Sequence, residues 1–212
     1  MHPFPYIKEL ADIEKITGFN DIAKIMNFVY TIVPWTLTPY TELITLAGIK
    51  PLYKKFKMKE AGGWCGLNAE FFKWIIEGYR QLDPCNIHVS SYNYGIAELK
   101  FTHIAIAVEI DKMEFLFDPY FNRYYVHKDG FPLQLEDLLF LIRERKTDKY
   151  KTVFLDSSKP AFTEDGVSFD FYPKELLKDI LDFFESTGFS KTMKKIFNDT
   201  NPDLLMLLKI PD

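Results

Sequence analysis

The hydrophobic period of this chain changes near its middle, and that change constrains the fold more than any other feature of the sequence. After Gly66, apolar residues recur every three or four positions, as on the buried side of a helix. These residues are Leu67, Phe71, Trp74, Ile75 and Gly78. Asp83-Pro84 then predicts a turn. Residues 87–92 instead alternate between apolar and polar side chains, which is typical of a half-buried strand.

Further elements are expected on both sides of this change. Strands are predicted over 103–110, 113–118 and 124–126, with a tight turn around Asp111-Lys112. Upstream, the apolar residues of 22–33 predict a buried helix that Asn20 or Asp21 caps and Pro34 ends. Other helices are expected over 40–47, 133–144, 173–185, 191–198 and 203–209, and the polar stretch 156–170 predicts a loop.

This order of elements predicts an α+β fold, in which a buried helix packs on a small antiparallel sheet with additional helices at both ends of the chain. The length of 212 residues suits a single domain, 1–212. Its helical N-terminal part is expected over 1–60, its core over 61–130, and a mostly helical C-terminal part over 131–212.

Charge and motif content exclude several classes of function. The net charge is −4 with no basic patch, so we expect no nucleic-acid partner. No apolar run approaches the roughly 20 residues that span a bilayer, so we expect no membrane association. The first residues lack a secretory signal pattern, and the only cysteines are Cys65 and Cys85, which favours a reducing, cytoplasmic location. P-loop, Rossmann, zincin and serine-hydrolase motifs are absent, and we expect no cofactor.

The sequence Ala61-Gly62-Gly63-Trp64-Cys65-Gly66 carries the strongest chemical signal. The glycines allow a sharp turn into the following helix. A thiol at the first turn of a helix experiences the positive end of the helix dipole and nearby backbone N–H groups, which favour the nucleophilic thiolate. The same N–H groups, including those of Cys65 and Gly66, can stabilise an oxyanion in acyl transfer.

A nucleophilic thiolate needs a base, and the base needs an orienting group. Of the four histidines, only His103 has a nearby carboxylate on the next predicted strand, namely Asp118. A turn at Ile110-Asp111 would place His103 directly opposite Asp118, and a turn at Asp111-Lys112 would place the two residues diagonally. Both registers put the two side chains on the same face of the sheet.

Together these stretches resemble the core of the transglutaminase-like, papain-related cysteine enzymes. The resemblance covers residues 61–125 and rests on Gly63-Trp64-Cys65-Gly66, Thr102-His103 and Phe117-Asp118-Pro119. It implies a papain/transglutaminase-like fold, with Cys65 as nucleophile, His103 as general base and Asp118 as its orienting carboxylate. The implied reaction is peptide or amide hydrolysis, or acyl transfer, through a thioester intermediate.

Two other functions stay open at the level of the sequence. Gly62-Gly63-Trp64-Cys65 also resembles the nucleophile motif of the arylamine N-acetyltransferases, which implies an acyl-coenzyme A donor. However, no Arg precedes Gly62, and Asp118-Pro119-Tyr120 replaces the Gly-containing sequence that those enzymes have after Asp. The third possibility is a catalytically silent binding or scaffold protein. The expected partner is therefore a peptide, amide or acyl-thioester substrate, and the oligomeric state is unknown.

Several other residues have more than one interpretation. Trp64 and Trp35 are candidate oxyanion donors or packing residues, and Asn68, one turn after Cys65, either assists the site or faces solvent. Asp118 before Pro119 also fits a simple turn residue. A zinc site would draw on Cys65, Cys85, His88 and His103. Since the Cys-x-x-His spacing matches no recognised pair of ligands and leaves Asp118 without a role, we expect no metal.

Overall fold

The structure is a computed structural model, and it describes residues 12–34, 48–82, 86–96, 101–144 and 146–156. Within these ranges, the side chains of 92–96, 101–103, 142, 143 and 147 fall outside the description. The helices predicted over 40–47, 173–185, 191–198 and 203–209 therefore lie outside the described residues.

A five-stranded antiparallel sheet forms the centre of the fold, and its strands lie side by side in chain order. The strands are β1 (Ile87–Ile96), β2 (Phe101–Ile110), β3 (Met113–Asp118), β4 (Arg123–His127) and β5 (Tyr150–Phe154). The prediction of an α+β fold with an antiparallel sheet is thus confirmed, as are four of the strands. Tyr150, Thr152, Val153 and Phe154 of β5 are residue types that favour strands, but this fifth strand was not predicted.

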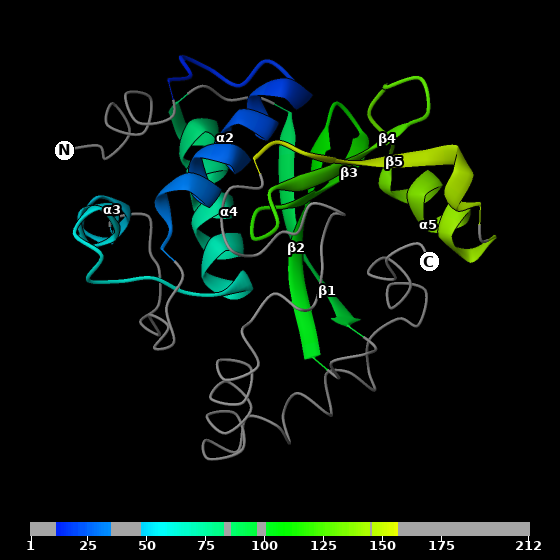
Figure 1. The fold of residues 1–212 in the computed structure, drawn as a ribbon. Coiled ribbons are helices and arrows are strands. Elements are labelled where there is room, and N and C mark those ends of the chain that lie inside the picture. Colours follow the sequence, from blue (N-terminus) through cyan, green and yellow to red (C-terminus); the bar gives the residue numbers. More distant parts are fainter. Residues whose placement is uncertain (1–11, 35–47, 83–85, 97–100, 145, 157–212) are drawn as a thin grey trace.

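Helices cover both faces of this sheet (Figure 1). One face packs against α2 (Phe19–Ile32) and α4 (Cys65–Leu82), and α3 (Ile49–Lys57) contacts the outer side of α2. On the other face lies α5 (Leu135–Arg143), followed by the short 3-10 helix η2 (Thr147–Lys149). We call these the α4 face and the α5 face of the sheet.

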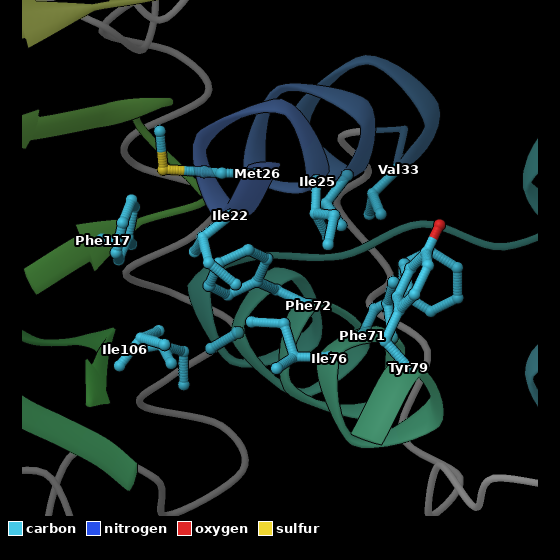
Figure 2. Close-up of a cluster of buried hydrophobic side chains, with 14 of the residues drawn as sticks. Ile22, Ile25, Met26, Val33, Phe71, Phe72, Ile76, Tyr79, Ile106 and Phe117 are labelled. Carbon is cyan, nitrogen blue, oxygen red and sulfur yellow. The ribbon is translucent and has the colours of Figure 1, made fainter. Parts of the chain in front are cut away.

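The main hydrophobic core fills the space between α2, α4 and the sheet. Phe72 of α4 and Phe117 of β3 are fully buried, and their ring centroids lie 6.1 Å apart. Figure 2 shows the centre of this cluster, with labelled side chains Ile22, Ile25, Met26, Val33, Phe71, Phe72, Ile76, Tyr79, Ile106 and Phe117. Burial of this many large apolar groups fixes the position of α4 on the sheet, because each such side chain stabilises the fold by about 1.5–3 kcal/mol.

The start of α2 differs from the sequence prediction. Neither Asn20 nor Asp21 caps the helix: the N-cap is Gly18, which makes no side-chain hydrogen bond. Asp21 instead lies in the first turn, where its Oδ2 accepts hydrogen bonds from the backbone N–H of Thr17 at 2.8 Å and from Thr17 Oγ1 at 2.6 Å. The Asp21 carboxylate thus anchors the residue before the N-cap, and its negative charge is favoured at this end of the helix.

A two-residue turn sets the register between β2 and β3. Asp111 and Lys112 have φ angles of 50° and 69°, the left-handed values that a tight hairpin turn of this kind requires. Ile110 therefore pairs with Met113, and Ile106 with Phe117. The predicted turn at Asp111-Lys112 is confirmed. The observed pairs end at Ile106 and Phe117, so the diagonal arrangement of positions 103 and 118 stays a prediction.

Candidate active site

The chain approaches Cys65 through Gly63, a position that leaves no room for a side chain. The N–H of Gly63 donates to the carbonyl of Pro34 at 2.9 Å. A Cβ atom on Gly63 would lie 2.5 Å from Cδ2 and 2.7 Å from Cβ of Leu67, distances that real contacts do not reach. Glycine is therefore required here so that the chain can pass directly over the first turn of α4.

Cys65 is the first residue of α4, an 18-residue helix with no acidic residue in its first turn. Its thiol is not in a disulfide, and the residue is half-buried, so that it is held by the fold yet reached by solvent. The helix dipole favours an anion at this end, and no neighbouring carboxylate of the first turn opposes it. These are the surroundings in which a cysteine becomes a nucleophile.

Asn68 supports the start of the helix from inside the protein. It is 3% exposed, so it does not face solvent. Its backbone N–H and its side-chain Nδ2 both donate to the carbonyl oxygen of Trp64, at 3.1 Å and 2.9 Å. Asn68 thereby fixes the backbone of Trp64, which directly precedes the thiol. Whether Trp64, Gly66 or Asn68 stabilises an oxyanion stays a prediction.

The start of α4 lies beside the beginning of β2. A Cβ atom on Gly66 would be 4.0 Å from Cδ1 of Ile104, so the residue after Cys65 lies beside the residue after His103. In Figure 1 the chain enters α4 at the same end of the sheet at which β2 begins. The fold thus brings the backbones of Cys65 and His103 into one neighbourhood, although the two residues are far apart in sequence.

Strand alternation assigns His103 and Ile104 to different faces of the sheet. Ile104 and Ile106 pack with the main core on the α4 face, whereas Ala105 and Ala107 belong to the α5 face. Position 103 has the same parity as Ala105 and lies opposite Tyr94 of β1. The His103 side chain is outside the described part of the structure. Position 103 itself lies before the stretch in which β2 pairs with β3, which begins at Ile106.

Asp118 lies on the α5 face, where the β2–β3 register, if continued beyond Ile106 and Phe117, would place it beside Ala105 and diagonal to position 103. The residue is fully buried. Its Oδ1 accepts a hydrogen bond from the backbone N–H of Phe121 at 3.1 Å, and its Oδ2 accepts one from Nε of Arg123 at 3.1 Å. The hydrogen bond from Phe121 fits the interpretation of Asp118 as a turn residue. The same carboxylate also forms a buried ion pair.

Arg123 is the residue of this neighbourhood that the sequence argument missed. Its position follows from the hairpin between β3 and β4, which pairs Asp118 with Arg123. The signal that would have found it is an Arg directly before the predicted strand 124–126, separated by a short turn from an Asp at the end of the preceding strand. The guanidinium also lies over the ring of Phe121, with Cζ 4.7 Å from the ring centroid.

Two tyrosines complete the polar group on the α5 face. Tyr125 is 3% exposed, and its hydroxyl has no hydrogen-bond partner among the described residues. Burial raises the pKa of Tyr125 to about 12; the charge of Arg123 acts against this rise, and those of Asp118 and Tyr150 add to it. Tyr150 packs edge-on to Tyr125 with ring centroids 6.3 Å apart. Asp118, Arg123, Tyr125 and Tyr150 therefore share one electrostatic environment.

Other candidate residues lie apart from this neighbourhood. His88 is exposed on β1, opposite Glu109 of β2. Trp35 and Cys85 are outside the described residues, so neither their predicted roles nor the alternative zinc site is tested. Among the described residues, no three His, Cys, Asp or Glu side chains are grouped as metal ligands would be. An open cleft of about 570 Å³ lies elsewhere, between the end of β4, α5 and η2.

Comparison of the chain with protein-family models, with curated proteins and with solved structures found no match. The transglutaminase-like resemblance therefore rests on the motif residues of the sequence. In the part of the chain that the structure describes, no helix combines the length and the apolar character needed to cross a bilayer.

Proposed function

We propose that this protein is a cysteine-dependent enzyme of the transglutaminase-like, papain-related kind, which hydrolyses an amide or transfers an acyl group. The observation that carries the proposal is the half-buried Cys65 at the start of α4, next to Gly66, which lies beside Ile104 of β2. His103 directly precedes Ile104 in β2, and the β2–β3 register, if continued beyond Ile106 and Phe117, would put it diagonal to Asp118.

In the proposed reaction, the Cys65 thiolate attacks the carbonyl carbon of an amide or thioester, and a C–S bond forms. Backbone N–H groups at the start of α4 stabilise the oxyanion. His103 donates a proton to the leaving group as the C–N or C–S bond of the substrate breaks, and Asp118 holds the imidazole tautomer. His103 then removes a proton from water or an amine, which attacks the thioester and releases Cys65.

The rate of iodoacetamide alkylation at Cys65 tests this proposal. It is measured between pH 5 and 9 by peptide mass mapping, with Cys85 as the internal reference thiol. We expect Cys65 to react rapidly well below pH 8.5, about the pKa of an ordinary thiol. This advantage should be lost in His103→Ala and kept in the control His88→Ala, which removes an exposed histidine from the neighbouring strand.

An acyl-enzyme provides the second readout. Incubation with p-nitrophenyl acetate should release nitrophenolate and leave an acetyl group on Cys65, detected by mass. A Cys65 that titrates like an ordinary thiol, whatever stands at position 103, would exclude the enzyme. Protection of Cys65 by coenzyme A would instead favour the acyl-coenzyme A alternative.

A catalytically silent scaffold of the same fold is the second candidate, and two observations favour it. The Asp118 carboxylate is already paired with Arg123, and strand alternation assigns position 103 to the face of the sheet opposite α4. If the protein is a scaffold, Cys65 and Cys85 should be alkylated at equal rates in denaturant, where both are exposed. In the folded protein, Cys65 should then be alkylated more slowly than it is in denaturant.

A further inference from the structure

The ion pair between Asp118 and Arg123 adds to the proposed site a component that the sequence motif does not contain. Arg123 Nε lies 3.1 Å from Asp118 Oδ2, and the two side chains are 5% and 1% exposed. Charges this deeply buried are retained only when they are paired, because each loses its hydration. Removal of the guanidinium would therefore deprive a buried carboxylate of the positive charge beside it.

Both oxygens of this carboxylate are anchored, which fixes its plane. Oδ1 accepts from the Phe121 N–H and Oδ2 from Arg123, while the ring of Phe121 supports the guanidinium from one side. An ionised carboxylate has about four lone-pair sites, so one carboxylate can accept hydrogen bonds from more than two donors. The β2–β3 pairs end at Ile106 and Phe117, and the same register continued beyond them would put position 103 diagonal to Asp118, on the same face.

We infer that Arg123 is a positioning residue of the proposed active site, which acts through Asp118 and not on the substrate. This inference rests on the proposed function. The guanidinium keeps Asp118 ionised and fixed. An ionised Asp118 holds the imidazole of His103 and stabilises its protonated form. A protonated imidazole in turn stabilises the thiolate of Cys65. The charge of Arg123 thus supports a thiolate on a different element.

Alkylation of Cys65 between pH 5 and 9 tests the inference in the full chain. The variants are Arg123→Gln and Arg123→Met, which remove the charge, and Arg123→Lys, which keeps it. At pH 6.5 we expect a rate about tenfold lower in the two neutral variants, as for a rise of one pKa unit, and a loss of no more than about threefold in Arg123→Lys. Tyr125 and Tyr150, which lie near the pair, stay neutral in this pH range.

Arg80→Met is the matched control, because Arg80 also pairs with a carboxylate, Glu77 on α4, at 2.8 Å, but near the surface. It should alkylate at the wild-type rate. Urea unfolding in the same buffer establishes that each variant is folded during the measurement. If Arg123→Met does not fold, Arg123→Gln decides the question, since its amide can still donate to Asp118.

Failure of the inference is distinguishable from failure of the proposed function. A wild-type Cys65 that is slow, or independent of His103, removes the proposed function and the inference with it. A fast, His103-dependent Cys65 whose pH profile is unchanged in folded Arg123→Gln overturns the inference alone. An equally large loss in Arg123→Lys also overturns it, because that variant keeps the charge.

Discussion

The side chains buried on the two faces of the sheet differ in kind. The α4 face packs aliphatic and aromatic groups such as Phe72 and Phe117 against two helices, and its buried Tyr79 hydroxyl donates to a backbone carbonyl. The α5 face buries the Asp118–Arg123 pair together with Tyr125, whose hydroxyl has no partner among the described residues.

This difference separates two sources of stability in one small domain. On the α4 face, stability depends on how well volume is filled, because the groups there are almost all apolar. On the α5 face it depends on whether each charge keeps its partner. The proposed site draws on both: Cys65 begins a helix of the first face, whereas Asp118 belongs to the second.

The largest loss of stability is expected on the α4 face. Phe72 is fully buried, and Phe72→Ala should lower the free energy of unfolding by about 4 kcal/mol, since it removes apolar contacts and leaves a cavity. Urea denaturation followed by circular dichroism measures it. The control Phe140→Ala removes a ring that is 51% exposed on α5 and should cost less than about 1 kcal/mol. Similar losses in both variants would contradict the inference that stability on the α4 face depends on how well apolar side chains fill its volume.

Loss of the charge partner should have the next largest effect. We expect Arg123→Met to lower the free energy of unfolding by about 3 kcal/mol, because it removes the buried counter-charge of Asp118. The double variant Asp118→Asn/Arg123→Met should recover at least half of this loss, since no unpaired charge remains. If the double variant is as unstable as Arg123→Met in urea, packing rather than pairing controls the α5 face.

The two faces also differ in how far the sequence predicts them. Strand alternation and helical period depend on neighbouring residues, so β2, β3 and α4 were predicted near their observed bounds. The tight turn at Asp111-Lys112 was predicted too. The left-handed backbone of both residues selects one of the two registers that the sequence allowed. The short β5 has too few residues for its period to stand out.

The Asp118–Arg123 pair was not predicted, because it depends on a tertiary contact. A sequence argument assigns Asp118 to its nearest plausible partner, His103, and has no measure of burial with which to require a counter-charge. The pairing of β3 with β4 supplies that information, since it places Arg123 next to Asp118 across the turn. Likewise, Asn68 was expected near the site or in solvent, and only the packing of α4 explains why it is buried.

A substitution at the entry to α4 tests how tightly the thiol is held on the first face. Gly63→Ala should lower the free energy of unfolding by about 2 kcal/mol, because its Cβ would overlap Leu67. The matched control Gly66→Ala meets only Ile104, at 4.0 Å, and should leave stability unchanged or raise it by up to about 1 kcal/mol, because Ala favours the helix more than Gly does. Equal urea midpoints for the two variants would show that the segment before Cys65 accommodates the added methyl group without loss of stability.

The smallest expected effects compare one buried tyrosine on each face. Tyr79→Phe should cost about 1 kcal/mol, because the Tyr79 hydroxyl donates to the carbonyl of Ile13 at 2.8 Å. Tyr125→Phe removes a buried hydroxyl without a partner, and should leave stability at pH 7 unchanged or raise it by less than about 1 kcal/mol. Urea denaturation of both variants at pH 7 makes the comparison.

Alkaline pH sharpens this comparison, because burial raises the pKa of Tyr125 to about 12. A phenol with a higher pKa in the folded state than in the unfolded chain binds its proton more tightly when folded. Its contribution to stability is therefore complete below about pH 10 and is lost as the pH rises toward 12. Tyr125→Phe should lose less stability than the wild type between pH 9 and 11. A parallel decline in both proteins would mean that Tyr125 ionises as freely in the folded protein as in the unfolded chain, and that the α5 face is open to water.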